Sequence, residues 1–201
     1  MKMPNVIKRI LHRASIMGLN PRWFVSQYRV TLVQEGGLPF VKFRIDSVEK
    51  ARVMASRCFE SYGQTDRKQF GVVMLTNQNQ VIGFNIAATG SVSSVLVSPR
   101  EVLKPAILTN AGAIILCYTQ PDGDVLPSRK DLSNVQKIVR AAWVIGIRVV
   151  DHLTISTGDG GYFSFAERGI IQKIYQSMNR PASAARDSKD ALLNSKSATL
   201  H

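Results

Sequence analysis

Apolar and polar positions change their spacing several times between residues 48 and 175, and each change marks a predicted helix or strand. Short apolar or alternating runs bounded by turn residues predict strands over 70–75, 81–88, 113–118, 147–155 and 162–165. Apolar residues three and four apart predict helices over 48–59, 98–110, 128–146 and 170–175. Strands interleaved with helices in this order predict an α+β or α/β domain, with a mixed sheet flanked by helices.

The predicted helices begin at side chains that can cap free backbone N–H groups. Asp46 or Ser47 is the expected N-cap of the helix over 48–59. Ser98 with Glu101, and Ser128 with Asp131, have the spacing of a capping box. The apolar side chains predicted to face the core from the helices over 98–110 and 128–146 are Val102, Leu103, Ile107, Leu108, Leu132, Val135, Ile138, Val139, Ala142 and Trp143.

The two ends of the chain have weaker patterns. Helical spacing over 5–19 predicts a short amphipathic helix, and alternation over 28–33 and 40–45 around Gly36-Gly37 predicts a β-hairpin. Toward the end of the chain, small, polar and charged residues predominate and predict a disordered tail. We therefore divide the chain into an N-terminal helix and hairpin extension (1–66), a central domain (67–177) and a tail (178–201).

Positive charge is concentrated near the N-terminus. The net charge of the 201 residues is +12, and residues 1–45 hold eight Lys or Arg residues against Glu35 alone, a net charge of +7. A cationic surface attracts polyanions by releasing their counterions, so nucleic acid is a candidate partner. The alternative is that these side chains only solubilise the surface. The candidate polyanion-binding residues are Lys8, Arg9, Arg13, Arg22 and Arg29.

Cysteine usage and hydropathy narrow the class of protein further. Cys58 and Cys117 do not have the spacing of a disulfide framework or a zinc finger. We therefore interpret both cysteines as buried, reduced thiols, which fits a protein of the reducing cytoplasmic compartment. No apolar run approaches the ~18 residues of a membrane-spanning helix, so we expect no membrane partner.

Several short motifs after Phe70 share their order and spacing with a known family. They are Val81-Ile82-Gly83, Thr89-Gly90-Ser91-Val92, Val97-Ser98-Pro99-Arg100-Glu101-Val102, Ile114-Ile115-Leu116, Pro121-x-Gly123-Asp124, Pro127-Ser128-x-x-Asp131, Asp151-His152 and Gly158-Asp159-Gly160-Gly161-Tyr162. Together they resemble the RadC-like branch of the JAB/MPN metalloprotease family. The resemblance implies the cytidine-deaminase-like mixed sheet of that family for the central domain.

The resemblance also implies where a zinc site would lie. In the family, a His-x-His pair at a strand end and an Asp at a helix start hold zinc, a glutamate is the general base, and a serine supports the oxyanion. The His positions correspond to Tyr118 and Gln120, the Asp position to Asp131, and the serine position to Ser128. The glutamate position corresponds to Lys68, just before the strand over 70–75.

These substitutions change the function that the resemblance implies. A phenol and an amide are poor zinc ligands, and a lysine in the same site would repel a divalent cation. We therefore expect a non-catalytic binding or scaffold module without a cofactor, linked to DNA repair or mobile elements through its relatives. Two alternatives stay open: a zinc-dependent hydrolase of the JAMM metallopeptidase class, and a sequence-nonspecific nucleic-acid-binding protein. A protein partner is also a candidate.

The motif residues that are retained also have structural interpretations. Ser128 and Asp131 form an adequate helix cap without any metal. Asp151 and His152, retained as in the family, can satisfy local hydrogen bonds rather than perform acid–base chemistry. The glycines between residues 158 and 161 lie between two predicted strands, which favours a hairpin turn over a phosphate-binding loop.

Overall fold

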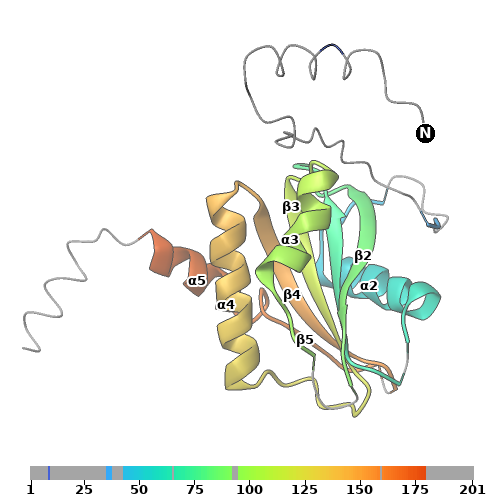
Figure 1. Cartoon of the computed structure of the whole chain (residues 1–201). Coiled ribbons are helices and arrows are strands. Elements are labelled where there is room, and N and C mark those ends of the chain that lie inside the picture. Colours follow the sequence, from blue (N-terminus) through green and yellow to red (C-terminus); the bar gives the residue numbers. More distant parts are fainter. Residues whose placement is uncertain are drawn as a thin grey trace, which may run out of the picture. The chain divides into compact units, whose positions relative to one another are not determined.

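The computed structural model describes residues 9, 35–37, 43–64, 66–91, 95–158 and 160–179 (Figure 1). The chain divides into two compact units, Met1–Val33 and Gln34–His201, and apart from Arg9 the described residues all belong to the second unit. Apart from Arg9, the helix predicted over 5–19 lies outside the described residues, as do the strand predicted over 28–33 and the tail from residue 180 onward.

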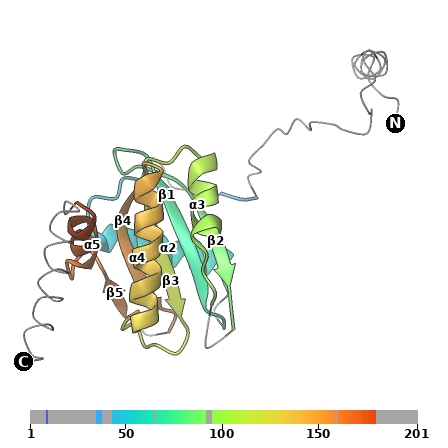
Figure 2. The same cartoon turned by 60° about the vertical axis from the view of Figure 1, so that its left-hand side comes forward.

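A five-stranded mixed sheet forms the centre of the second unit (Figures 1 and 2). Its strands are β1 (Gln69–Leu75), β2 (Val81–Thr89), β3 (Ala113–Gln120), β4 (Arg148–Ser156) and β5 (Tyr162–Ser164), in the spatial order β2-β1-β3-β4-β5. β1 is antiparallel to β2 and β3, β3 is parallel to β4, and β4 is antiparallel to β5. Every residue of β1 and β3 is buried, which explains their almost continuous apolar sequences. The predicted mixed sheet is confirmed.

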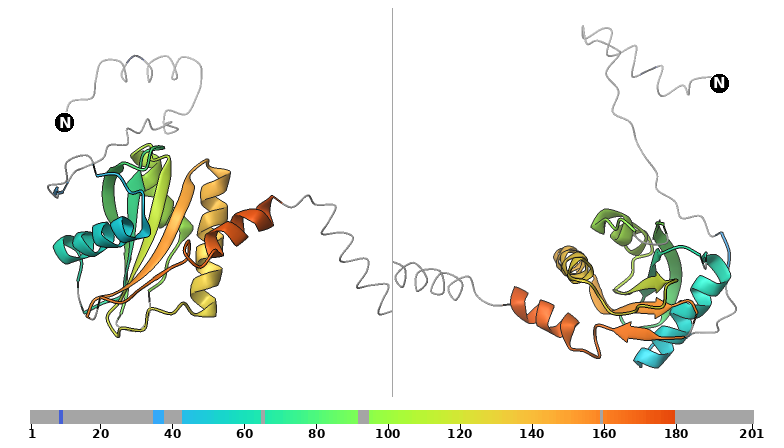
Figure 3. Two further views of the ribbon diagram at one scale, coloured as in Figure 1. Left: turned by 180° about the vertical axis from the view of Figure 1, so that it is seen from behind. Right: turned by 90° about the horizontal axis from the view of Figure 1, so that it is seen from below.

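Helices cover both faces of this sheet (Figure 3). α2 (Val48–Tyr62) packs on one face through Ala51, Met54, Ala55, Cys58 and Phe59. On the other face, α3 (Pro99–Leu108), α4 (Arg129–Val144) and α5 (Ile170–Met178) enclose a second apolar core. α2, which the sequence division placed in the N-terminal extension, therefore belongs to the same packed structure as the strands.

The side chains around α3 and α4 differ in part from the prediction. The capping box predicted at Ser98 is wrong: its side chain makes no cap hydrogen bond, and Glu101 instead pairs with Lys104 at 2.8 Å. Ile107 and Trp143 were expected to face the core but are 54% and 52% exposed. The buried residues of α3 are Val102, Leu103 and Ala106. Ile107 follows Ala106 on the helix and therefore points away from this buried face, toward solvent.

The segment before α2 pairs with the turn between β1 and β2. Arg44 forms an isolated antiparallel bridge with Gln80, Ile45 N–H donates to the Asn79 carbonyl at 2.9 Å, and Val81 N–H donates to the Phe43 carbonyl at 2.9 Å. Residues 43–45, which belong to the second predicted strand of the hairpin, thus pair with this turn. The first predicted strand of the hairpin, over 28–33, lies outside the described residues. None of the helices in the described ranges is long and apolar enough to cross a membrane.

Candidate functional site

The candidate site lies where β3 ends and α4 begins. Tyr118 and Gln120 are two residues apart on β3, so their side chains point to the same face of the sheet, and they are 9% and 7% exposed. Tyr118 lies opposite Phe70 in the β1–β3 register, with 6.3 Å between the ring centroids. The Thr119 hydroxyl accepts a hydrogen bond from Gln69 N–H at 2.8 Å and ties β1 to β3 at this end.

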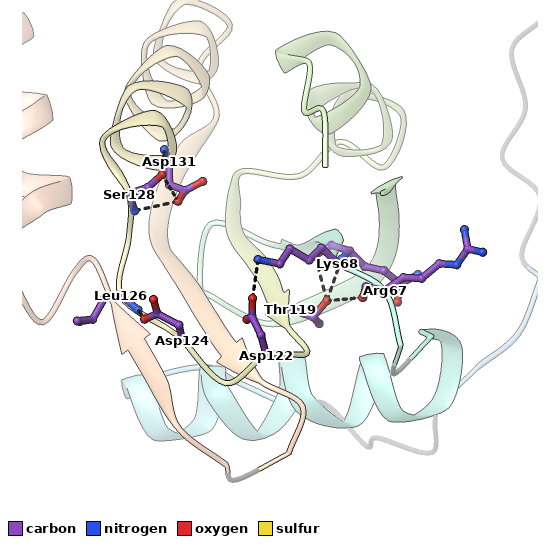
Figure 4. Close-up of polar contacts among 9 residues, drawn as sticks. Arg67, Lys68, Thr119, Asp122, Asp124, Leu126, Ser128 and Asp131 are labelled. Atoms are coloured by element: carbon purple, nitrogen blue, oxygen red, sulfur yellow. Dashed lines mark hydrogen bonds and ion pairs between the residues drawn. The ribbon is translucent and has the colours of Figure 1, made fainter. Parts of the chain in front are cut away.

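Lys68 places an ammonium group in the site. It precedes β1 by one residue and is 7% exposed, and its Nζ lies 3.2 Å from an oxygen of Asp122 in the loop after β3 (Figure 4). The sequence placed Lys68 at this site but missed Asp122 as its partner. No local pattern signals this pairing, because Asp122 lies in the turn after β3 and only the pairing of β1 with β3 brings it close to Lys68.

Tyr118 carries a protonated phenol at neutral pH. Burial and, to a smaller extent, the nearby carboxylates of Asp131 and Asp122 raise the pKa of its hydroxyl to about 12. A phenol binds metal ions well only after it loses its proton, and each of these influences opposes that loss. Tyr118 is therefore a poor replacement for an imidazole ligand.

Asp131 and Ser128 form the predicted capping box at the start of α4 (Figure 4). The Ser128 hydroxyl accepts from the Asp131 N–H at 3.2 Å and donates to the Asp131 carboxylate at 2.6 Å. The same carboxylate oxygen accepts from the Ser128 N–H at 2.9 Å. Both side chains thus satisfy backbone groups of the helix without any metal.

A small cavity opens beside Tyr118 and Asp131. Its volume of about 20 Å³ is enough for roughly one water-sized group. The lining residues are Phe70, Val95, Val97, Tyr118, Asp131, Asn134, Val135 and His152. The sequence did not predict the contributions of Val95, Val97 and Asn134, because they come from a loop and a helix face that only the tertiary fold brings to the strand end.

His152 is the most deeply buried polar residue of this cavity. Its ring stacks on Phe70 at 5.7 Å between centroids and meets Phe165 edge-on at 4.6 Å. Burial lowers its pKa from 6.5 to about 4, so the imidazole is neutral at pH 7. Among the side chains that the structure describes, only His152 Nδ1 and Gln120 Oε1 are buried nitrogen or oxygen atoms without a hydrogen-bond partner.

Asp151 has a structural role next to His152. Its carboxylate accepts from His152 N–H at 2.7 Å, Ala166 N–H at 2.7 Å and the Ser164 hydroxyl at 2.6 Å. These bonds join β4 to β5 and to the turn that follows. Burial raises the pKa of this carboxyl, and the three hydrogen bonds oppose that rise. Asp151 therefore satisfies local hydrogen bonds, as its structural interpretation predicts.

The side chains present do not fit a zinc ion. Proteins hold zinc with imidazole, thiolate and carboxylate groups, whereas the strand end offers a protonated phenol and an amide beside an ammonium group. Over the described ranges, no three His, Cys, Asp or Glu side chains lie close enough together to bind a metal ion. Cys117 does not replace a ligand, because it faces the α2 side of the sheet and burial raises its thiol pKa well above the ordinary value.

Of the predicted polyanion-binding residues, the structure describes only Arg9. Arg9 is exposed, whereas Lys8, Arg13, Arg22 and Arg29 lie outside the described residues. Their role as a binding surface stays a prediction.

Comparisons with known proteins agree with the fold. A family model described as "RadC-like JAB domain" matches residues 47–170. UPF0758 protein STH371 of Symbiobacterium thermophilum is 46% identical over 104 residues, which cover 52% of this chain and 44% of that protein. A UPF0758 protein of Moorella thermoacetica is 38% identical over 124 residues, or 62% of this chain and 53% of that protein. UPF0758 protein YeeS of Escherichia coli is 41% identical over 106 residues, or 53% of this chain and 70% of that protein. The chain spans about half the length of the first two relatives.

Proposed function

Because the chain belongs to the RadC-like JAB domain family, we propose that it is a non-catalytic member of that family, a binding or scaffold module that holds no zinc. One observation carries this proposal: Tyr118 and Gln120 occupy the strand end where the resemblance expects two histidines, and the Lys68 ammonium lies 3.2 Å from Asp122, in the loop that follows this strand end. A divalent cation in this site would have to overcome the repulsion of that ammonium group.

Metal analysis of the purified chain tests the proposal. The full chain is incubated with excess zinc, desalted and analysed for bound metal. We expect far less than one zinc ion per chain, because only Asp131 remains of the ligand set that the resemblance implies. About one ion per chain would contradict the proposal and favour the alternative, a zinc-dependent hydrolase of the JAMM class with an unusual ligand set.

Restoring the two histidines tests the position of the site. The double variant Tyr118→His with Gln120→His should bind zinc together with Asp131, since imidazole and carboxylate are zinc ligands. A matched control, Tyr118→Phe with Gln120→Asn, changes the same two positions without adding a ligand and should bind none. A folded double-histidine variant without zinc affinity would show that these positions do not form the site. Hydrolysis should also need Lys68→Glu to supply a general base.

Nucleic-acid binding is a second candidate function, and the net charge of +12 favours it. Nucleic-acid binding would also fit a link to DNA repair or to mobile elements. Affinity for duplex DNA should fall steeply with added salt, because phosphate contacts release counterions. Replacing Lys8, Arg9 and Arg13 by glutamine in the full chain should weaken it. Binding that responds to neither change would rule this function out.

A further inference from the structure

α5 packs beside α4 (Figures 1 and 2), and side chains of these two helices line a second concave feature of the surface. It is an open groove of about 340 Å³, near the lower end of the range of ligand pockets, ~300–1,000 Å³. The lining residues are Arg129, Leu132, Ser133 and Gln136 of α4 with Ile170 and Ile174 of α5. The α4 residues recur at intervals of three and four, so one continuous face of that helix forms the wall of the groove.

The groove has an apolar floor and a basic rim. Leu132 is 36% exposed, and the side chains of Ile170 and Ile174 continue its apolar surface on α5. Arg129 lies at the edge, and helical spacing from Ser133 and Gln136 places the exposed Arg140 farther along the same face of α4. In the described part of the chain, neither of these two cations forms an ion pair within 4 Å.

The apolar floor and the basic rim together favour one class of binding partner over others. An apolar floor offers nothing to a phosphate backbone, and the lining residues include no aromatic ring on which a base could stack. An amphipathic helix matches both features, because it presents apolar anchors at i, i+3, i+4 and i+7 between polar side chains. Uncompensated cations at the rim favour acidic residues on the flanks of that helix.

We infer that the groove between α4 and α5 binds an acidic amphipathic helix of a protein partner. The inference rests on the proposed binding role, for which it supplies a surface and a class of partner. It concerns a different surface from the cavity at His152. The apolar anchors of the partner contact Leu132, Ile170 and Ile174, and its carboxylates pair with Arg129 and Arg140.

A designed helical peptide tests the inference on the full chain. The probe is a fluorescent amphipathic peptide of about 18 residues, with leucine anchors at helical spacing and glutamate elsewhere. Two comparison probes are a lysine-for-glutamate version and a scrambled acidic version. Fluorescence anisotropy measures affinity, and amide NMR shifts locate the contact. We expect the acidic amphipathic peptide to bind, the other two to bind far more weakly, and shifts to concentrate on α4 and α5.

Arg129→Glu and Lys130→Glu make a matched pair of variants. Both reverse one charge on the first turn of α4, where a negative charge suits the helix dipole, so both should fold. Only Arg129 lines the groove, so Arg129→Glu should weaken peptide binding by about tenfold and Lys130→Glu by less than about twofold. Leu132→Gln should also weaken binding, because it removes an apolar anchor of the floor.

Three outcomes would overturn the inference. One is that no probe peptide binds the wild-type chain, and another is that both charge reversals have equal effects. The third is that a short DNA duplex, rather than the acidic peptide, shifts the groove amides in a way that Arg129→Glu abolishes. About one zinc ion per chain in the metal analysis would contradict the proposed non-catalytic function. It would not change what the peptide experiments show about the groove.

Discussion

Lowering the pH should destabilise the protein through His152 before most of its carboxylates are protonated. The imidazole is 2% exposed and lies between the rings of Phe70 and Phe165. Burial lowers its pKa from 6.5 to about 4. In the window between these values the unfolded chain binds a proton at His152 that the folded chain does not. The stability that His152 contributes is therefore complete above pH 6.5 and is lost as the pH falls toward 4.

The size of this effect follows from the two pKa values. The interval from 6.5 to about 4, at about 1.36 kcal/mol for each pH unit, corresponds to about 3 kcal/mol of unfolding free energy. Domains of ordinary stability have only about 5–15 kcal/mol in total. Protonation of this single side chain should thus remove a large fraction of the stability.

Other groups titrate nearby, so the measurement needs a variant that lacks the imidazole. The pKa values of Asp46, Glu49 and Glu101 are lowered, mainly by hydrogen bonds to Lys or Arg side chains, and the stability that they contribute is lost at still lower pH. The pKa of Asp151 is raised by burial, which has the opposite sign: protonation at low pH relieves its desolvation. Subtracting the pH dependence of His152→Gln from that of the wild-type chain isolates His152.

The assay is urea unfolding at several pH values between 7 and 4.5 for the wild-type chain and His152→Gln. The wild-type chain should lose about 2–3 kcal/mol more than the variant over this range. His12→Gln, at a histidine outside the described residues, is the matched control and should behave like the wild-type chain. Equal pH dependence in the wild-type chain and His152→Gln, or an NMR titration of the His152 imidazole near pH 6.5, would refute the reasoning.

Three further predictions test the helix cap, the core and the buried thiols. Ser128→Ala should lower the unfolding free energy by about 1 kcal/mol, whereas Ser133→Ala on the same helix should change it by less than about 0.5 kcal/mol; equal effects in urea denaturation would contradict the capping role. Ile115→Ala should cost about 2–5 kcal/mol, since Ile115 is fully buried between β1 and β4, and a loss below about 1 kcal/mol would show a looser core. Burial raises the pKa of the Cys58 thiol to about 12 and holds that of Cys117 well above its ordinary value, so iodoacetamide at pH 8 should alkylate both only after denaturation; mass spectrometry showing alkylation of the native chain would contradict this.

The sequence was most informative where local chemistry alone decides the structure. Ser128 and Asp131 form the predicted capping box because both partners lie within one helical turn. α4 ends near Gly146, as predicted, since its φ of +77° suits a residue without a side chain. Cys117 and Tyr118 face opposite sides of the sheet, as strand alternation requires. Each of these features depends only on neighbours along the chain.

Features that depend on packing between elements could not be predicted in the same way. Trp143 continues the apolar spacing of α4, but its ring packs edge-on against Tyr175 of α5, with 5.7 Å between the ring centroids, and stays half exposed. The pairing of Lys68 with Asp122 joins the start of β1 to a loop some fifty positions later in the chain. The groove between α4 and α5 depends on how α5 returns across the domain, which no periodicity of α4 reveals.

Hydrogen bonds and an ion pair at the strand end hold the loop after β3 through protein groups alone. The Gln120 carbonyl accepts from Gly123 N–H at 3.2 Å and from Thr157 N–H at 3.3 Å, so backbone hydrogen bonds hold the loop after β3. Thr119 binds this end of β3 to Gln69, and Lys68 ties the loop to β1 through Asp122. A bound zinc ion would add stability by mass action, but no element here depends on that contribution for its position. The same reasoning favours the double-histidine variant as a folded protein, because its two substitutions change side chains on a backbone that other contacts already hold.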